Sequence, residues 1–211
     1  MTIVRDVAGI VLAAGRSSRM GEGRNKLLED VAGRPIVARV VDAFLEAEID
    51  PLIVVTGHQA DRVRSVLEDR RVRFVDHAGW REGMGSSISE GMAELRRSGA
   101  LCAAVLVCVG DLPGLRADHV RAIVRAAREP SGGIDPARIV VPSHRGQRGH
   151  PVLFGARHFA ALGNLTGDEG ARSVVRGNAP NVHLLEFEDD ACLRDVDTVD
   201  DLAALRTRIS G

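Results

Sequence analysis

Short apolar runs alternate with amphipathic helical patterns from Val7 to residue 128, and this alternation limits the possible folds most. Val7 to Ala14 is such a run, and the segment 35–47 then repeats apolar residues at helical spacing behind Pro35, which suits a first helical position. Further runs at 51–55, 72–75 and 100–109 are each followed by a loop and a helical pattern. Runs that are apolar on both faces are typical of parallel strands covered by helices on each side. The sequence therefore predicts a Rossmann-like α/β/α domain with three layers and a mostly parallel sheet.

The remaining third of the chain is less regular. Apolar runs at 139–141 and 152–154 predict a strand pair around a polar loop, and 182–187 predicts another strand. Helices are expected over 158–162, over 168–175 and from 199 to 209, the last with Thr198 as its N-cap. Since no linker or internal repeat divides the chain, residues 1–211 are predicted to form a single domain.

The charge balance excludes several kinds of partner. With 28 basic and 29 acidic residues, the chain lacks the excess of Lys and Arg on which binding to nucleic acids and membrane surfaces depends.

The apolar runs and the cysteines indicate where the protein is found. The longest apolar run, 100–109, is shorter than the about 20 residues that span a bilayer. Cys102, Cys108 and Cys192 have the spacing of neither a disulfide framework nor a zinc site. We expect a cytoplasmic protein with reduced cysteines.

A basic, glycine-rich loop follows the first predicted strand, over residues 12–28. Its glycines allow backbone N–H groups to converge on anionic oxygens, and its cations neutralise charge from outside. The loop carries glycines at 15, 21 and 23 and the basic residues Arg16, Arg19, Arg24 and Lys26. This combination favours a polyphosphate ligand, and a flexible surface turn is the alternative. The sequence matches neither the P-loop pattern nor Gly-x-Gly-x-x-Gly, which disfavours those two phosphate sites.

An aspartate follows the most apolar run of the chain, in the segment Gly110-Asp111-Leu112-Pro113. Open α/β sheets bind their ligands at the carboxyl ends of central strands. The position therefore predicts that Asp111 binds a metal ion, whereas a turn-capping role is the alternative.

Several separate motifs resemble those of one family. Leu-Ala-Ala-Gly-x-Ser-x-Arg-Met-Gly at 12–21, with Lys26 behind it and the segment 110–113, is similar to the signature of the MobA-like nucleotidyltransferases, which act on the molybdenum cofactor. Segments 80–87, 149–154, 167–172 and 195–198 resemble the cytidylyltransferase branch, and the Gly-Pro-Leu loop of the guanylyl branch is missing. The chain departs from the family at Leu112, at Val199, in the longer approach to Lys26 through Arg24 and Asn25, and in its few aromatic residues.

The resemblance implies a reaction and a set of site residues. CMP would pass from CTP to the molybdopterin cofactor with release of pyrophosphate, and Mg²⁺ would assist. The catalytic residues would be Arg19, Lys26 and Asp111, with Mg²⁺ shared by Asp111 and Asp197, or by Asp195 in place of Asp197. The predicted nucleotide and acceptor contacts are Leu12, Ala13, Ala14, Gly15, Arg16, Ser17, Ser18, Arg19, Lys26, Thr56, Ser86, Ser87 and His150.

Several of these residues also have a purely structural interpretation. His150 is explained equally well as a histidine that holds the 143–150 loop, and Ser86 and Ser87 as N-caps of the following helix. Trp80 is interpreted as a packing anchor, with a stacking platform as the alternative. Asp168 and Arg172 are interpreted as an ion pair on a helix face, with a role in acceptor binding as the alternative.

Three other functions are compatible with the same residues. The first is nucleotidyl transfer with another base or acceptor. The second is an insertion chaperone that carries a molybdenum cofactor to a partner molybdenum hydroxylase. The third is an NAD(P)H-dependent reductase, which the absence of Gly-x-Gly-x-x-Gly disfavours.

Overall fold

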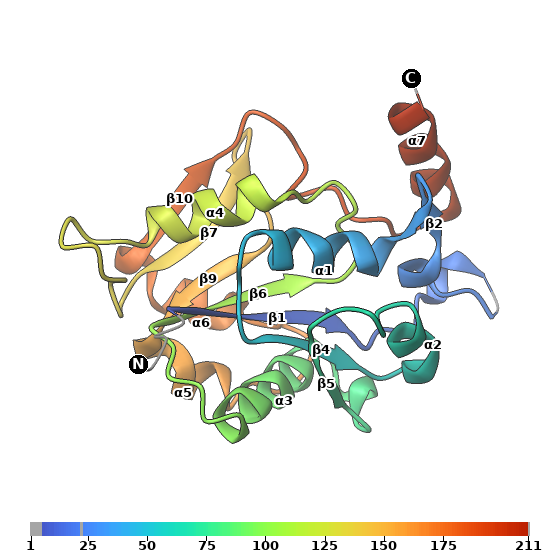
Figure 1. The fold of residues 1–211 in the computed structure, drawn as a ribbon. Coiled ribbons are helices and arrows are strands. Elements are labelled where there is room, and N and C mark those ends of the chain that lie inside the picture. Colours follow the sequence, from blue (N-terminus) through green and yellow to red (C-terminus); the bar gives the residue numbers. More distant parts are fainter. Residues whose placement is uncertain (1–5, 22, 211) are drawn as a thin grey trace.

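The computed structural model describes residues 6–21 and 23–210, except for the side chains of 207–210. The single-domain prediction for 1–211 includes residues 1–5, 22 and 211, which lie outside the described residues. In Figure 1 the described chain forms one twisted sheet with helices on both of its faces. This arrangement confirms the predicted three-layer α/β architecture.

The sheet is mostly parallel. Strands β1, β4, β5 and β6 run parallel to one another, β9 runs antiparallel to its neighbours β6 and β7, and β10 is parallel to β7. Its spatial order is β10-β7-β9-β6-β1-β4-β5, with the short β8 paired to β7. The strands are β1 (Val7–Ala13), β4 (Leu52–Thr56), β5 (Arg73–Asp76), β6 (Ala104–Val109), β7 (Ile139–His144), β8 (Gln147–Arg148), β9 (Val152–Gly155) and β10 (Val182–Glu186).

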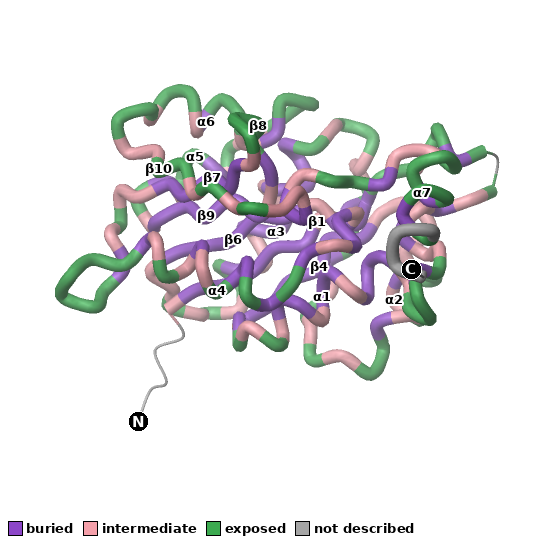
Figure 2. Tube along the Cα trace, turned by 90° about the horizontal axis from the view of Figure 1, so that it is seen from above, coloured by how far each residue is buried: buried purple, intermediate pink, exposed green. Residues whose placement is uncertain are grey.

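Helices cover the two faces of the sheet in two groups (Figure 1). One face is covered by α1 (Ile36–Glu46), α2 (Ala60–Ser65) and α4 (Ala117–Ala126), and the other by α3 (Met84–Arg97), α5 (Phe159–Leu162) and α6 (Arg172–Gly177). Figure 2 shows the strands as the buried interior between these layers. The glycine at 91 lets α3 lie close to the sheet, because a β-carbon there would be 2.7 Å from Ile10 Cγ2.

A third, smaller apolar cluster fixes the last helix, α7 (Val199–Ser210), beside the hairpin of β2 (Asp30–Val31) and β3 (Arg34–Pro35). It joins residues that are far apart in the sequence and almost fully buried: Met20, Val31, Ile36, Val196, Leu202 and Leu205. Because Met20 belongs to the glycine-rich loop and Val196 lies between Asp195 and Asp197, this cluster brings the end of the chain to that loop.

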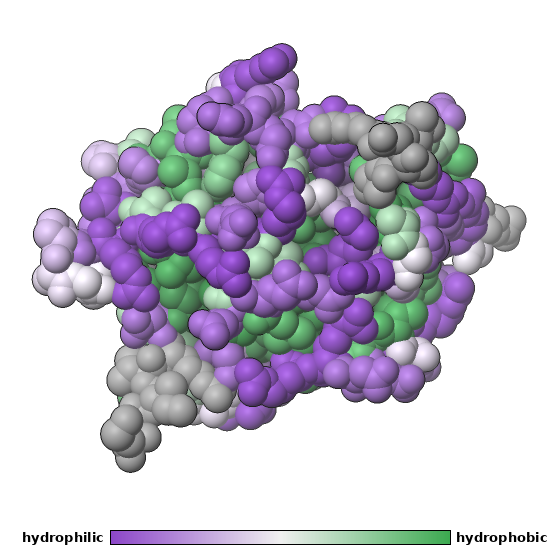
Figure 3. Space-filling view, turned by 45° about the horizontal axis from the view of Figure 1, so that its top comes forward, coloured by the Kyte–Doolittle hydropathy of each residue, from purple (hydrophilic) through white to green (hydrophobic). Residues whose placement is uncertain are grey.

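The surface is mainly polar. Figure 3 shows hydrophilic residues over most of one face, with smaller apolar areas between them. Within the described residues, no helix has the length and apolar character needed to cross a bilayer.

The structure corrects several predicted boundaries. Pro35 ends β3 and caps α1, which begins at Ile36, and the run from 100 becomes a strand only at Ala104. The predicted helix over 168–175 begins only at Arg172, because Gly167 and Gly170 adopt positive φ angles of 68° and 58° that interrupt a helix. The strand pair around 139–154 is confirmed as β7 and β9.

Candidate active site

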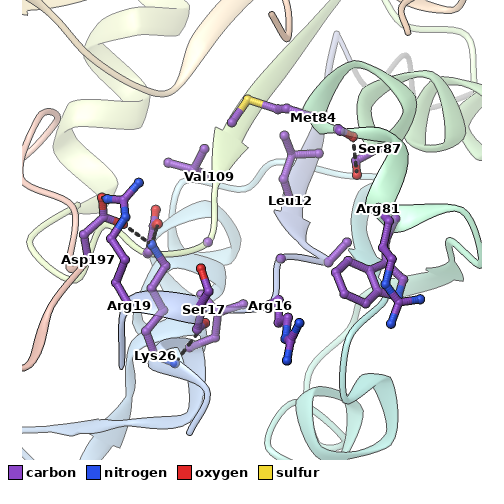
Figure 4. Close-up of a pocket in the computed structure, with 18 of the residues that line it drawn as sticks. Leu12, Arg16, Ser17, Arg19, Lys26, Arg81, Met84, Ser87, Val109 and Asp197 are labelled. Atoms are coloured by element: carbon purple, nitrogen blue, oxygen red, sulfur yellow. Dashed lines mark hydrogen bonds and ion pairs between the residues drawn. The ribbon is translucent and has the colours of Figure 1, made fainter. Parts of the chain in front are cut away.

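A cavity of about 560 Å³ opens where β1 and β6 end. Because these two strands are parallel, the loops that follow them meet at one edge of the sheet. Figure 4 shows side chains from the loop after β1, from the start of α3 and, with Asp197, from the segment before α7 around this space. The lining residues are Leu12, Ala14, Gly15, Arg16, Ser17, Ser18, Arg19, Lys26, Leu27, Trp80, Arg81, Gly83, Met84, Ser87, Val109, Gly110, Asp111, Asp168 and Asp197.

The glycine-rich loop is closed on itself by a pair of side chains. Ser17, in a left-handed conformation with φ of 57°, accepts a hydrogen bond from the Lys26 backbone N–H at 3.1 Å. Its hydroxyl donates to Asn25 Oδ1 at 3.3 Å, and that oxygen also accepts from the Leu27 N–H at 3.1 Å. Asn25 is only 3% exposed. These bonds tie Ser17 to residues 25–27, which favours a built phosphate loop over a flexible surface turn.

Lys26 lies between two carboxylates at the acidic end of the cavity. Its Nζ is 2.5 Å from Asp111 Oδ2 and 2.6 Å from Asp197 Oδ1, and Arg19 also pairs with Asp197 (Figure 4). Burial by itself lowers the pKa of Lys26, but the two aspartates outweigh it and raise this pKa. The hydrogen bond from Lys26 lowers the pKa of Asp197. Both cations predicted to bind phosphate are thus held by carboxylates in this structure.

Asp195 completes an acidic group with these two aspartates. One oxygen from each of Asp111, Asp195 and Asp197 lies within 4.8 Å of the others, and burial raises the pKa of Asp195 with help from the two neighbouring charges. Asp111 Oδ1 is buried and has no hydrogen-bond partner among the described residues. Oxygen ligands of this kind fit Mg²⁺ or Mn²⁺. The sequence predicted either Asp195 or Asp197 as the second ligand, whereas the structure puts both beside Asp111.

The structure places most of the predicted site residues in one cavity. Those that line it are Leu12, Ala14, Gly15, Arg16, Ser17, Ser18, Arg19, Lys26, Ser87, Asp111 and Asp197. Four others, Ala13, Thr56, Ser86 and His150, do not line it. Ala13 is fully buried at the end of β1, and Thr56 is buried with its hydroxyl donating to Asp76 Oδ1 at 2.5 Å.

Ser86 and His150 lie outside the cavity and have contacts elsewhere. Ser86 donates to the Gly83 carbonyl at 2.8 Å and contacts His77 Nε2 at 2.9 Å, so it lies in the first turn of α3 and is not the N-cap. The His150 backbone N–H donates to the Cys192 carbonyl at 2.8 Å, and burial lowers the pKa of the imidazole. His150 Nδ1 is buried without a partner among the described residues.

The segment before α3 forms the opposite wall. Trp80 packs so closely on Gly57 that a β-carbon there would be 2.8 Å from Trp80 Cβ, as expected for a packing anchor. The Arg81 guanidinium lies over the Trp80 ring at 4.4 Å from its centroid, a cation–π geometry. Arg81 and Met84 line the cavity, although sequence reasoning did not select them.

Asp168 also lines the cavity, although the sequence favoured an ion pair over a ligand contact for it. The prediction of an ion pair with Arg172 on a helix face is wrong, since Asp168 precedes α6 and makes no ion pair or hydrogen bond within the described part of the chain. The two flanking glycines, 167 and 170, were the signal in the sequence that a loop rather than a helix presents this aspartate.

Comparison with known proteins identifies the family. The family model for the MobA-like NTP transferase domain matches residues 9–184, which include the glycine-rich loop, Asp111 and Asp168. The chain belongs to the MobA-like NTP transferase family. This confirms the resemblance drawn from the separate motifs, and the chain is of the nucleotidyltransferase kind.

Several known proteins match over almost the whole chain. Nicotine blue oxidoreductase of Paenarthrobacter nicotinovorans is 31% identical over 94% of this chain and 96% of its own length. A nucleotidyl transferase from Methanothermobacter has the same fold, with a TM-score of 0.81, 24% identity and coverage of 97% and 98%. A Mycobacterium tuberculosis protein in complex with manganese has a TM-score of 0.73, 26% identity and coverage of 97% and 99%.

Proposed function

We propose that this protein transfers CMP from CTP to the molybdopterin form of the molybdenum cofactor and releases pyrophosphate. The main support for this proposal is that the basic loop, Asp111 and Asp197 line the same cavity. A nucleoside triphosphate needs both features, because cations must balance its phosphates and carboxylates must hold its metal ion.

The reaction requires positioning more than covalent chemistry by the protein. An oxygen of the acceptor phosphate forms a bond to the α-phosphorus of CTP, while the bond from that phosphorus to the oxygen bridging the α- and β-phosphates breaks. That oxygen leaves as part of pyrophosphate. Arg19 and Lys26 bind the phosphates, with backbone N–H groups of residues 14–18 around them. No protein nucleophile is required.

The acidic group would hold the metal ion of this reaction. Asp111 and Asp197, joined by Asp195, offer the oxygen ligands that a hard divalent cation prefers. Bound there, Mg²⁺ would stabilise negative charge on the phosphates and on the leaving group. The manganese complex of the Mycobacterium tuberculosis relative supports a divalent cation in this fold.

The base and the acceptor are assigned from the segments that resemble the cytidylyltransferase branch. Residues 80–87 form the wall that would face the base, and Ser87 is the one of its two serines that reaches the cavity. The predicted contacts of Thr56, Ser86 and His150 would act through the groups they support, since none of the three lines the cavity. We place the reaction in the cytoplasm, with a molybdenum hydroxylase as the user of the product.

The test is pyrophosphate release by the purified protein from CTP, Mg²⁺ and molybdopterin cofactor, with GTP and ATP in parallel. Asp111→Ala should abolish release and leave the circular dichroism spectrum and Tm nearly unchanged. Cofactor binding without pyrophosphate release from any of the three nucleotides would instead favour an insertion chaperone. Near-native release by the variant would remove Asp111 from the metal site.

A reductase is a second candidate, because the relative from Paenarthrobacter nicotinovorans is named an oxidoreductase and matches end to end. Three arginines line the cavity. Arg19 pairs with Asp197, and the other two, Arg16 and Arg81, suit the additional phosphate of NADPH. Saturable quenching of NADPH fluorescence by the protein, reversed by neither CTP nor GTP, would favour this reductase over nucleotidyl transfer.

A further inference from the structure

Three carboxylates line the cavity, and Asp168 differs from the other two. Asp111 and Asp197 are balanced by Lys26 and Arg19. Asp168 has no hydrogen bond or ion pair within the described part of the chain. An ionised carboxylate accepts hydrogen bonds and donates none, so a ligand beside Asp168 must present a donor to it.

The backbone holds Asp168 in place. The Gly85 N–H donates to the Gly167 carbonyl at 2.7 Å, which ties the loop before α6 to the first turn of α3. Gly83 has a φ of 109°, and a β-carbon there would be 2.5 Å from the Gly167 carbonyl oxygen. At Gly85 a β-carbon would be 2.5 Å from the Thr166 carbonyl oxygen. Two glycines therefore allow the two loops to touch, and this contact puts Asp168 at the cavity wall.

The neighbours of Asp168 suit a ring rather than a phosphate. Met84 packs over Gly170, where a β-carbon would be 2.9 Å from Met84 Sδ, so Met84 and Asp168 belong to one wall. Leu12 and Val109 add further apolar surface to the cavity. A carboxylate without a cation repels phosphate, whereas the basic loop attracts it. The triphosphate is thus expected at the loop, and a flat apolar group at the wall.

We propose that Asp168 recognises an amino-substituted nitrogen heterocycle by accepting hydrogen bonds from its exocyclic amino group. A ring with an N–H next to that amino group would donate two parallel bonds to the carboxylate, and cytosine would donate one. The proposal rests on the proposed function and names the chemistry by which the site selects its substrate. The ring is either the base of the nucleotide or the pterin of the acceptor.

The experiment compares ligands that differ at the amino group. Dissociation constants are measured by calorimetry, with Mg²⁺ present, for CTP against UTP, for GTP against ITP, and for pterin against its 2-oxo analogue. The wild type should prefer the amino compound of at least one pair, and Asp168→Asn should reduce that preference about tenfold, the size expected for a hydrogen bond to a charged group. Loss in a nucleotide pair assigns the ring to the base, and loss in the pterin pair assigns it to the acceptor.

Glu169→Gln is the matched control, because it removes the same charge from the adjacent residue. Glu169 pairs with Arg176 at 3.3 Å and does not line the cavity, so this variant should keep the wild-type preference. The Tm of Asp168→Asn should equal that of Glu169→Gln within about one degree.

Two results would overturn the proposal. One is a wild type without preference in all three pairs. The other is an Asp168→Asn variant that keeps the preference or weakens both members of a pair equally, as a contact to ribose would. If the wild type binds no nucleotide but Asp168→Asn loses the pterin preference, the proposed function fails and this inference stands. If the wild type prefers CTP and Asp168→Asn keeps every preference of the wild type, the proposed function stands and this inference fails.

Discussion

Replacement of Lys26 by methionine should leave the acidic end of the cavity without its central cation. Lys26 contacts Asp111 at 2.5 Å and Asp197 at 2.6 Å, and the side chains are 15%, 13% and 34% exposed. Breaking a fully buried ion pair costs about 3–5 kcal/mol, and an exposed pair contributes about 0–1 kcal/mol. For this partly buried group we expect a loss of about 2 kcal/mol, or roughly 4–8 °C in Tm for a protein of this size.

The free energy of unfolding of Lys26→Met should depend on pH differently from that of the wild type. In the wild type, Lys26 lowers the pKa of Asp197, so this contribution to stability is present above the unfolded pKa of about 4 and is lost as the pH falls further. The raised pKa of Lys26 matters only above about pH 10. The contribution of the Lys26–Asp197 pair is therefore flat from pH 8 to 5 in the wild type, where the raised pKa of Asp195 adds a gain in stability as the pH falls. Without Lys26, the clustered carboxylates raise one another's pKa further, so the variant should gain more stability than the wild type as the pH falls from 8 to 5.

Divalent cations provide a second measurement on the same variant. Mg²⁺ or Mn²⁺ added without nucleotide competes with the Lys26 ammonium in the wild type, whereas in Lys26→Met it meets the more exposed Arg19 on Asp197. The metal ion should therefore stabilise the variant more, by a free energy of RT ln(1 + [L]/Kd), and should raise its Tm more than that of the wild type. Arg24→Met is the control, because Arg24 lies in the same loop and pairs with Glu29 at 2.8 Å. Equal Tm values for Lys26→Met and wild type at pH 8, with equal shifts on metal addition, would show that the Lys26 ammonium does not balance the two aspartates.

Two further substitutions test the loops that build the cavity. Ser17→Ala removes two hydrogen bonds of the loop, so it should lower the free energy of unfolding by about 1–2 kcal/mol. Calorimetry should show CTP binding weakened severalfold, and an unchanged Kd for CTP would show that binding does not depend on these two bonds. Gly83→Ala meets both a positive φ and the Gly167 carbonyl, so it should cost about 3 kcal/mol in urea denaturation. Gly133→Ala, with open space at its β-carbon, should cost less than about 1 kcal/mol, and equal midpoints for the two variants would contradict the close contact of the loops.

The fold was largely predictable because its signal is local. Apolar runs such as 104–109 and helical spacing such as 36–46 record burial residue by residue, and the alternation of the two determines the layers. Element boundaries were less predictable where a tertiary contact decides them. Pro35 pairs with Asp30 in a two-stranded sheet instead of starting the helix, and nothing in the local pattern indicates that pairing.

The candidate site was predictable where a residue directly follows a strand. Asp111 and the loop from Gly15 meet because both follow strands that end at the same edge. Asp168 and Arg81 were not selected as site residues because their positions depend on contacts between loops, such as the bond from Gly85 to Gly167. The closure of the loop by Asn25 was also missed, since it depends on a side chain folding back to Ser17.

The small cluster around Met20 has a consequence for the order in which the protein is made. The last strand of the sheet ends at Glu186, so every strand leaves the ribosome before Asp195 and Asp197 do. Asp111 is also made well before the other two carboxylates of the acidic group, and Val196 packs on Met20 at the point where those two reach the glycine-rich loop. The acidic group is thus complete only after every strand of the described sheet has been made.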